Sequence, residues 1–160
     1  MVDEHAPIQI QIATPVGWFR ARVVGSALTS ARFFTEGRSE GDGPVRDALD
    51  AYFAGDTAAI DVIETRAQGS AFQQRVWRAL RRVPAGTTVS YGELAREVGV
   101  PGAARAVGRA NATNPVGLVV PCHRIVRTDG TIGGYAGGVE RKRWLLDHES
   151  RSNASAVTSP

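Results

Sequence analysis

The spacing of the apolar residues changes near residue 68, and this change limits the fold more than any other feature. Before it, residues 8–13 alternate apolar and polar side chains, which is typical of a β-strand with one buried face. After it, apolar residues recur every three or four positions along 70–83, which is typical of an amphipathic helix. The two periods predict an α+β protein with a strand-rich first part and a mostly helical second part.

Residues 1–67 are expected to form a small α+β scaffold domain. Residues 44–55 predict a short helix, since Pro44 suits the first helical position and Gly55 can end the helix. Turn signals separate three segments with strand character. Strands are therefore expected at 8–13, 18–24 and 27–34.

Residues 68–150 are expected to form a second, mostly helical domain. Residues 90–99 predict a helix, because Ser90 and Glu93 have the spacing of a capping box. A break rich in Gly and Pro then leads into residues 103–112, a second short helix of small residues and arginine. Two short helices around a tight turn indicate a helix-turn-helix.

The charges are divided unevenly between the two parts. Residues 1–67 hold 6 Arg and 10 acidic residues, a net charge of −4, whereas residues 68–160 hold 12 Arg, 1 Lys and 6 acidic residues, a net charge of +7. The second part is therefore the one expected to bind a polyanion, although a basic face can also be merely solvated. Residues 151–160 are polar and aperiodic, and a disordered tail is expected there.

The chain has one cysteine, Cys122, which restricts its redox and metal chemistry. An intramolecular disulfide is impossible, and Cys122 with the three histidines offers no zinc-binding spacing, so neither a metal nor a cofactor is expected. No stretch reaches the roughly 18 apolar residues of a membrane span, and no basic segment precedes an apolar one at the start. A cytoplasmic protein is expected.

The neighbours of Cys122 favour a reactive thiol, although an isolated buried cysteine is usually only a small hydrophobe. His123 adds an ionisable group, and Arg124 and Arg127 supply positive charge, which favours a thiolate. The preceding apolar run, 116–120, is expected to be a buried extended segment.

Geometry limits what His123 can do in such a segment. Adjacent side chains of an extended chain point to opposite sides, so His123 could act on Cys122 only through a turn or a bridging water. Glu149, at the end of a predicted helix, is a candidate partner that would orient His123. Helix ends of this composition are also commonly just solvated.

From Phe72 to Glu149 the sequence resembles the O6-alkylguanine-DNA alkyltransferases, also called methylated-DNA–protein-cysteine methyltransferases. The motifs SYGELA, AARAVG, NP and PCHR follow one another in the order found in that family. The first half resembles the family more loosely, through its strand-rich start and LDAYFAG. The resemblance implies a ribonuclease-H-like first domain and a winged-helix-like second domain.

The resemblance also implies direct reversal of DNA alkylation. Cys122 would attack the alkyl carbon on O6 of guanine, with O4 of thymine as a second candidate position, and the thioether would remain, so that each molecule acts once without a cofactor. His123 would activate Cys122 through a water, and Glu149 would orient His123. Asn114 would tie the turn to the active-site segment, and Tyr91 would donate to the departing base.

Binding of double-stranded DNA containing alkylated guanine is implied as well. The helix carrying Ala104, Arg105 and Arg109 would enter the minor groove, with Tyr91 nearby and Arg105 filling the gap left by the flipped base. The protein is expected to act as a monomer, and cooperative assembly on DNA is left open.

The resemblance places the alkyl pocket at Pro121, Tyr135 and Ala136. Serine often stands in the family where this chain has Ala136, so one hydrogen bond to O6 is expected to be missing. Backbone N–H groups of the glycine-rich loop could still serve.

Two other classes of function remain open. One is a damage sensor or helix-turn-helix DNA-binding protein that marks lesions without repairing them, although such sensors lack the reactive cysteine. The other is a thiol hydrolase using Cys122, His123 and Asn114, although no cysteine-protease signature is present and the basic half would be unexplained.

Overall fold

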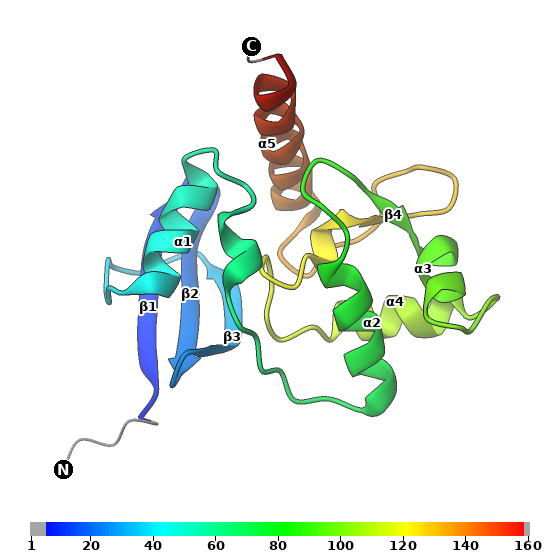
Figure 1. The fold of residues 1–160 in the computed structure, drawn as a ribbon, viewed down its shortest axis with the longest axis horizontal. Helices are drawn as coiled ribbons and strands as arrows, with labels where there is room; N and C mark the ends of the chain where they lie inside the picture. The colour runs from blue at the N-terminus through cyan, green and yellow to red at the C-terminus, as the bar shows by residue number, and fades with distance from the viewer. Residues whose placement is uncertain (1–5, 159–160) are drawn as a thin grey trace. The chain divides into compact units, whose positions relative to one another are not determined.

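The computed structural model describes residues 6–158, which divide into two compact units. The first unit is Met1–Gln68 with Pro115–Val119, and the second is Gly69–Asn114 with Val120–Pro160. Figure 1 shows the strands β1 to β3 and helix α1 in the first unit and helices α2 to α5 in the second. The architecture is a mixed α+β fold, as the two hydrophobic periods predict.

A three-stranded antiparallel sheet is the base of the first unit. Its strands are β1 (Ile8–Thr14), β2 (Gly17–Val24) and β3 (Ala27–Phe34), in that order across the sheet. Alternate residues such as Ile12, Phe19 and Ala31 are buried, which is the period-2 pattern of a sheet covered on one face. The three predicted strands are confirmed.

Helix α1 (Pro44–Phe53) lies over the sheet (Figure 1). Pro44 is in the first turn, where no backbone N–H is needed, and Gly55 follows the helix with φ 118°. Leu49 and Tyr52 point inward and are fully buried. A short 3-10 turn, η1 (Ala59–Val62), adds Ile60 to the same core.

The apolar run 116–120 is not the continuous extended segment that its composition predicts. Val116 makes one isolated parallel bridge to Ala31 of β3, and the chain then turns through Leu118, whose φ is 71°. The prediction is wrong here because a short apolar run looks the same whether it is a strand or a buried turn. Leu118 adopts an uncommon conformation for a non-glycine residue while being fully buried.

The second unit is built on helices α2 (Ala71–Arg81), α3 (Tyr91–Glu97) and α4 (Ala104–Ala112). Both α2 and α3 pack on α4, and the Trp77 indole donates to the backbone oxygen of Ala110 at 2.8 Å. Capping boxes begin α2 at Ser70 and α3 at Ser90. The predicted pair of short helices, α3 and α4, is present, with Gly99 at φ 85° two residues after the end of α3.

Two short elements complete the second unit around the cysteine. Strand β4 (Val89–Ser90) pairs in parallel with β5 (Ile125–Val126), and the 3-10 turn η2 (Cys122–Arg124) directly precedes β5. This pairing fixes the start of α3 beside the segment that carries Cys122.

Helix α5 (Val139–Thr158) ends the described chain and differs from the expected disordered tail. It continues through most of 151–160, because the sequence has neither glycine nor proline between Val139 and Pro160 to stop it. Among the residues that the structure describes, no helix is long and apolar enough to cross a membrane.

Candidate active site

Cys122 opens the 3-10 turn η2 and is 6% exposed. Its backbone N–H donates to the Val120 oxygen at 2.8 Å, and the Asn114 side-chain amide donates to that same oxygen at 2.9 Å. These bonds set the turn in place before the cysteine. Burial raises the pKa of the Cys122 thiol, while the Asn114 side chain and the charge of Lys142 act in the opposite direction.

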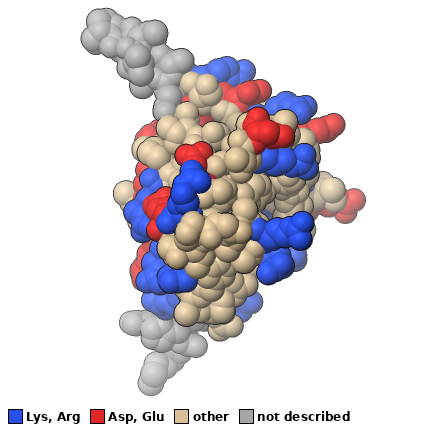
Figure 2. All heavy atoms as spheres, turned by 90° about the vertical axis from the view of Figure 1, so that its right-hand side faces the viewer, with Lys and Arg blue, Asp and Glu red and all other residues tan. Residues whose placement is uncertain are grey.

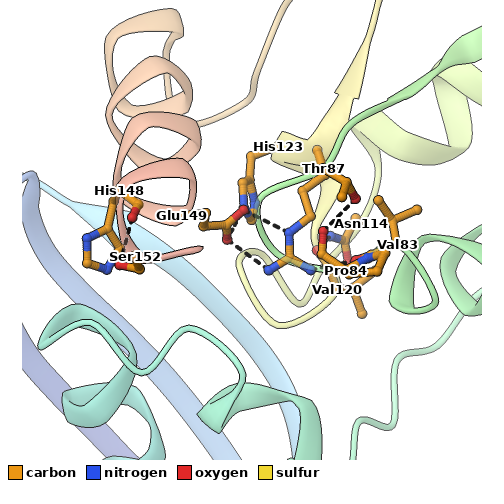
Figure 3. A network of polar contacts seen from close by, with 10 residues as sticks. Val83, Pro84, Thr87, Asn114, Val120, His123, His148, Glu149 and Ser152 are labelled. Carbon is orange, nitrogen blue, oxygen red and sulfur yellow. Dashed lines mark hydrogen bonds and ion pairs between the residues drawn. The ribbon is translucent and has the colours of Figure 1, made fainter. Parts of the chain in front are cut away.

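His123 and Glu149 form the centre of a buried polar network (Figure 3). His123 Nε2 lies 2.8 Å from Glu149 Oε2, and neither residue is exposed. Arg124 holds the same carboxylate with two bonds, Nε to Oε1 at 2.9 Å and Nη2 to Oε2 at 2.8 Å. Its Nη1 donates to the Val83 oxygen at 2.7 Å, so the guanidinium is fixed on both sides.

The charges of this network determine which form each group takes. Burial alone would raise the pKa of Glu149, but the charges and hydrogen bonds of His123 and Arg124 outweigh it and hold that pKa well below its usual range. Burial lowers the pKa of His123 more than Glu149 raises it, so the ring is neutral near pH 7. The network is therefore an ionised carboxylate beside a neutral imidazole.

The tautomer of His123 follows from its partner. An ionised carboxylate can only accept, so the shared hydrogen belongs to Nε2 and the lone pair to Nδ1. In the described part of the chain, Nδ1 is buried with no hydrogen-bond partner. His123 thus presents a basic nitrogen while its other nitrogen is held.

Two phenols and a glycine-rich loop lie around the thiol. Burial raises the pKa of both Tyr91 and Tyr135, and the charge of the Cys122 thiolate adds to this effect. The Tyr135 ring stands edge-on to His123, with centroids 6.4 Å apart. A Cβ at Gly137 would lie 2.7 Å from the Tyr135 ring, so only glycine permits this close turn.

The remaining predicted pocket residues flank this cluster. Pro121 is buried directly before η2, and Ala136 is exposed on the loop after Tyr135. The surroundings of the thiol differ from the sequence interpretation in one respect. Arg124 is paired with Glu149, and the cation whose charge lowers the pKa of Cys122 is Lys142, which sequence reasoning missed.

Helix α4 carries the residues predicted to bind DNA. Arg105 and Arg109 are exposed one turn apart, and Ala104 is partly exposed beside them. A Cβ at Gly108 would lie 3.5 Å from the Tyr91 ring, so α4 contacts the start of α3. Figure 2 shows the side where α3 and α4 lie in Figure 1, and basic side chains flank an uncharged area there.

Fold and site together define a class of protein with a free, buried cysteine, a histidine–carboxylate pair and an adjacent pair of short helices. Residues 71–151 match the model of the family described as 6-O-methylguanine DNA methyltransferase, DNA binding domain. The chain belongs to this family.

Named relatives agree with this assignment. The methylated-DNA–protein-cysteine methyltransferase of Salmonella typhimurium is 56% identical over 107 residues, covering 67% of this chain and 63% of that protein, which is less than two thirds of its length. The Shigella flexneri protein of the same name is 44% identical over 162 residues, covering 89% of this chain and 95% of that protein.

Solved structures resemble both units of the chain. The crystal structure of Mycobacterium tuberculosis O6-methylguanine methyltransferase has a TM-score of 0.78 and 40% identity, covering 91% of this chain and 94% of that one. A crystal structure of Mycobacterium tuberculosis OGT in complex with DNA has a TM-score of 0.79 and 40% identity, covering 90% and 93%.

Proposed function

We propose that this protein repairs alkylated DNA by moving the alkyl group from O6 of guanine to Cys122 in a single turnover. The observation that supports this most strongly is the site itself: a buried thiol next to a neutral histidine whose Nε2 is held by an ionised glutamate. Nucleophile, base and orienting group are the three parts by which enzymes activate a weak nucleophile. Relatives named methylated-DNA–protein-cysteine methyltransferases support the same reaction.

In the proposed reaction the Cys122 proton passes through a water to His123 Nδ1. Glu149 stabilises the imidazolium that forms, because its carboxylate is already ionised and in contact with Nε2. The thiolate sulfur forms a bond to the alkyl carbon while the bond from that carbon to O6 breaks and its electron pair moves to guanine. Tyr91 donates a proton to the departing base, and the proton on His123 restores the phenol.

The alkyl group would be received by Pro121, Tyr135 and Ala136. Tyr135 supplies an apolar ring, which stands edge-on to the His123 ring. Ala136 has no hydroxyl, so we infer that O6 is recognised by backbone N–H groups of the loop rather than by a side chain.

The DNA-binding part of the proposal rests on α4. Its small residues allow close approach to the minor groove, which is about 6 Å wide. Ala104 and Arg109 would contact the backbone, and Arg105 would replace the flipped guanine in the stack. Binding as a monomer to alkylated duplex DNA, with little sequence preference, follows from contacts of this kind.

We also propose domain roles and a finer fold type for the two units. The sheet with α1 supports a ribonuclease-H-like scaffold domain at 1–67, and α3, α4 and the β4–β5 pair support a winged-helix-like DNA-binding domain at 68–150.

The test is the intact mass of the protein after incubation with a duplex containing O6-methylguanine. We expect a stoichiometric gain of one methylene mapped to Cys122, with no gain in Cys122→Ser or with unmodified duplex. Tight and lesion-selective binding without any mass change would contradict repair and establish the damage-sensor alternative instead.

Replacing Arg105 tests how the base is reached. We expect Arg105→Ala to slow methyl transfer from duplex DNA about tenfold or more. Extruding a base costs a few kcal/mol, and the alanine variant no longer offsets part of that cost by filling the gap in the stack. Reaction with free O6-methylguanine base should change little, because nothing has to be flipped. Exposed Arg143 on α5 provides the control, Arg143→Ala. Equal slowing with free base and duplex would contradict the role given to Arg105.

A further inference from the structure

Lys142 is the only lysine in the chain, which uses arginine at its other 18 basic positions. It lies on the face of α5 that also carries Leu145 and Glu149, and it is fully buried. In the described part of the chain no carboxylate lies within ion-pair distance of its Nζ. A buried ammonium without an acidic partner is costly, so its position needs a reason.

Lys142 holds the glycine-rich loop at two points. Its Nζ donates to the Gly134 oxygen at 3.1 Å, and its backbone N–H donates to the Gly138 oxygen at 3.1 Å. Tyr135 and Ala136, the residues proposed to receive the alkyl group, lie between those two glycines. The side chain and backbone of one residue thus fix both ends of the pocket loop.

The Lys142 ammonium also lies near the phenol proposed to act on the departing base. A Cβ built at Gly133 would lie 3.6 Å from Lys142 Nζ and 3.7 Å from Tyr91 Oη, so both polar atoms approach the same point. The Arg127 side chain reaches that glycine as well, with its Cγ 3.5 Å from the same position. The ammonium therefore stands at the edge of the reaction site.

Electrostatic coupling joins this ammonium to the thiol. Burial lowers the pKa of Lys142 to about 8, the charge of Cys122 raises it, and Arg127 lowers it. In return, Lys142 lowers the pKa of both Cys122 and His123. Arg124 is paired with Glu149 and does not contribute to the Cys122 shift, so Lys142 provides the positive charge that the thiolate experiences.

We propose that Lys142 is a positioning residue for alkyl transfer, whose ammonium stabilises the Cys122 thiolate while its hydrogen bond to Gly134 holds the alkyl-pocket loop. The role in alkyl transfer rests on the proposed function, whereas the electrostatic coupling between Lys142 and Cys122 can be measured without DNA. Lysine suits the position because its ammonium is a compact point charge, whereas the larger planar guanidinium prefers carboxylate pairs such as the one Arg124 makes.

The first test measures thiol ionisation without DNA. The ultraviolet absorbance of the thiolate, taken as the difference from Cys122→Ser, reports one group because the chain has one cysteine. We expect Lys142→Met to raise the titration midpoint by about one unit and to slow alkylation by iodoacetamide about tenfold at neutral pH. Lys142→Arg should retain most of the wild-type midpoint.

The matched control is Arg141→Met. Arg141 Nη1 donates to the Gly137 oxygen at 3.1 Å, so this variant removes a cation that holds the same loop, whereas the charge that lowers the Cys122 pKa is that of Lys142. Its thiol midpoint should equal that of the wild type. A Lys142→Met protein with an unchanged midpoint, or an equal shift in Arg141→Met, would overturn the proposal.

A second measurement needs no lysine variant and so does not depend on the folding of Lys142→Met. Isotope-labelled lysine gives a single side-chain resonance in this chain, and its titration can be compared between wild type and Cys122→Ser. We expect a lower Lys142 midpoint in Cys122→Ser, where no thiolate can form, and equal midpoints would refute the coupling. Failure of methyl transfer from DNA in the wild type would contradict the proposed function while leaving this result intact.

Discussion

Replacing Glu149 with alanine is expected to lower the free energy of unfolding by about 3–5 kcal/mol, the usual cost of removing one partner of a buried ion pair. The variant leaves the Arg124 guanidinium and His123 Nε2 buried without the carboxylate that both contact. Denaturant unfolding followed by circular dichroism measures the loss. Asp147→Ala, at an exposed position on the same helix, should change stability by no more than about 0.5 kcal/mol.

The difference in unfolding free energy between wild type and Glu149→Ala depends on pH, and the direction of this dependence follows from the pKa of Glu149. The pKa of Glu149 is lower in the folded protein than its ordinary value of 4.5, so its contribution is fully present above that value. The contribution is lost as the pH falls from there toward the folded pKa. The stability gap between wild type and Glu149→Ala should therefore be constant near neutral pH and narrow in acid. A Glu149→Ala protein as stable as Asp147→Ala would show that the network is not a stabilising element.

Replacing His123 with alanine is expected to slow alkyl transfer to Cys122 by about 10²–10⁴-fold, the range for loss of a positioned general base. Glu149 keeps its two bonds from Arg124 in this variant, so the carboxylate remains paired. The rate is measured in single-turnover experiments with a duplex containing O6-methylguanine. His148→Ala provides the control, because the His148 ring stacks on Trp144, with the ring centroids 4.7 Å apart.

The role of His123 as a base also predicts how the rate of alkyl transfer falls at acid pH. Burial lowers the pKa of His123 below its ordinary value of 6.5, so the neutral form that accepts a proton persists at pH 6.5. The midpoint of the fall in the wild-type rate with decreasing pH should therefore lie below pH 6.5, and this fall should disappear in His123→Ala. A variant within threefold of the wild-type rate would contradict the role of His123.

Local signals in the sequence predicted the secondary structure well. Alternation at 8–13 and the turn signals after it predicted the three strands, apolar spacing predicted the helix along 70–83, and the capping residue Ser90 marked the start of the next helix. These features are encoded within a few residues of one another, so no knowledge of the tertiary fold is needed to recognise them. The turn at 116–120 was missed because its conformation depends on pairing with Ala31, about 85 residues earlier in the chain.

The site was predictable to the extent that it follows from motifs. Cys122 and His123 stand out locally, whereas the contact of Arg124 with the Val83 oxygen joins positions 41 residues apart and has no sequence signature. Lys142 could have been found. It is the single lysine, and its spacing of three and seven residues from Leu145 and Glu149 places it on the buried face of its helix.

Residues 115–119 belong to the first unit although both flanking segments belong to the second. Val116, Leu118 and Val119 are buried there, and the chain returns only two residues before Cys122. A fragment cut at residue 68 would therefore leave an apolar segment uncovered directly before Cys122. Such a fragment should aggregate or lose its reactivity unless residues 1–68 are supplied as a separate chain, which makes the protein a candidate for split-protein reconstitution.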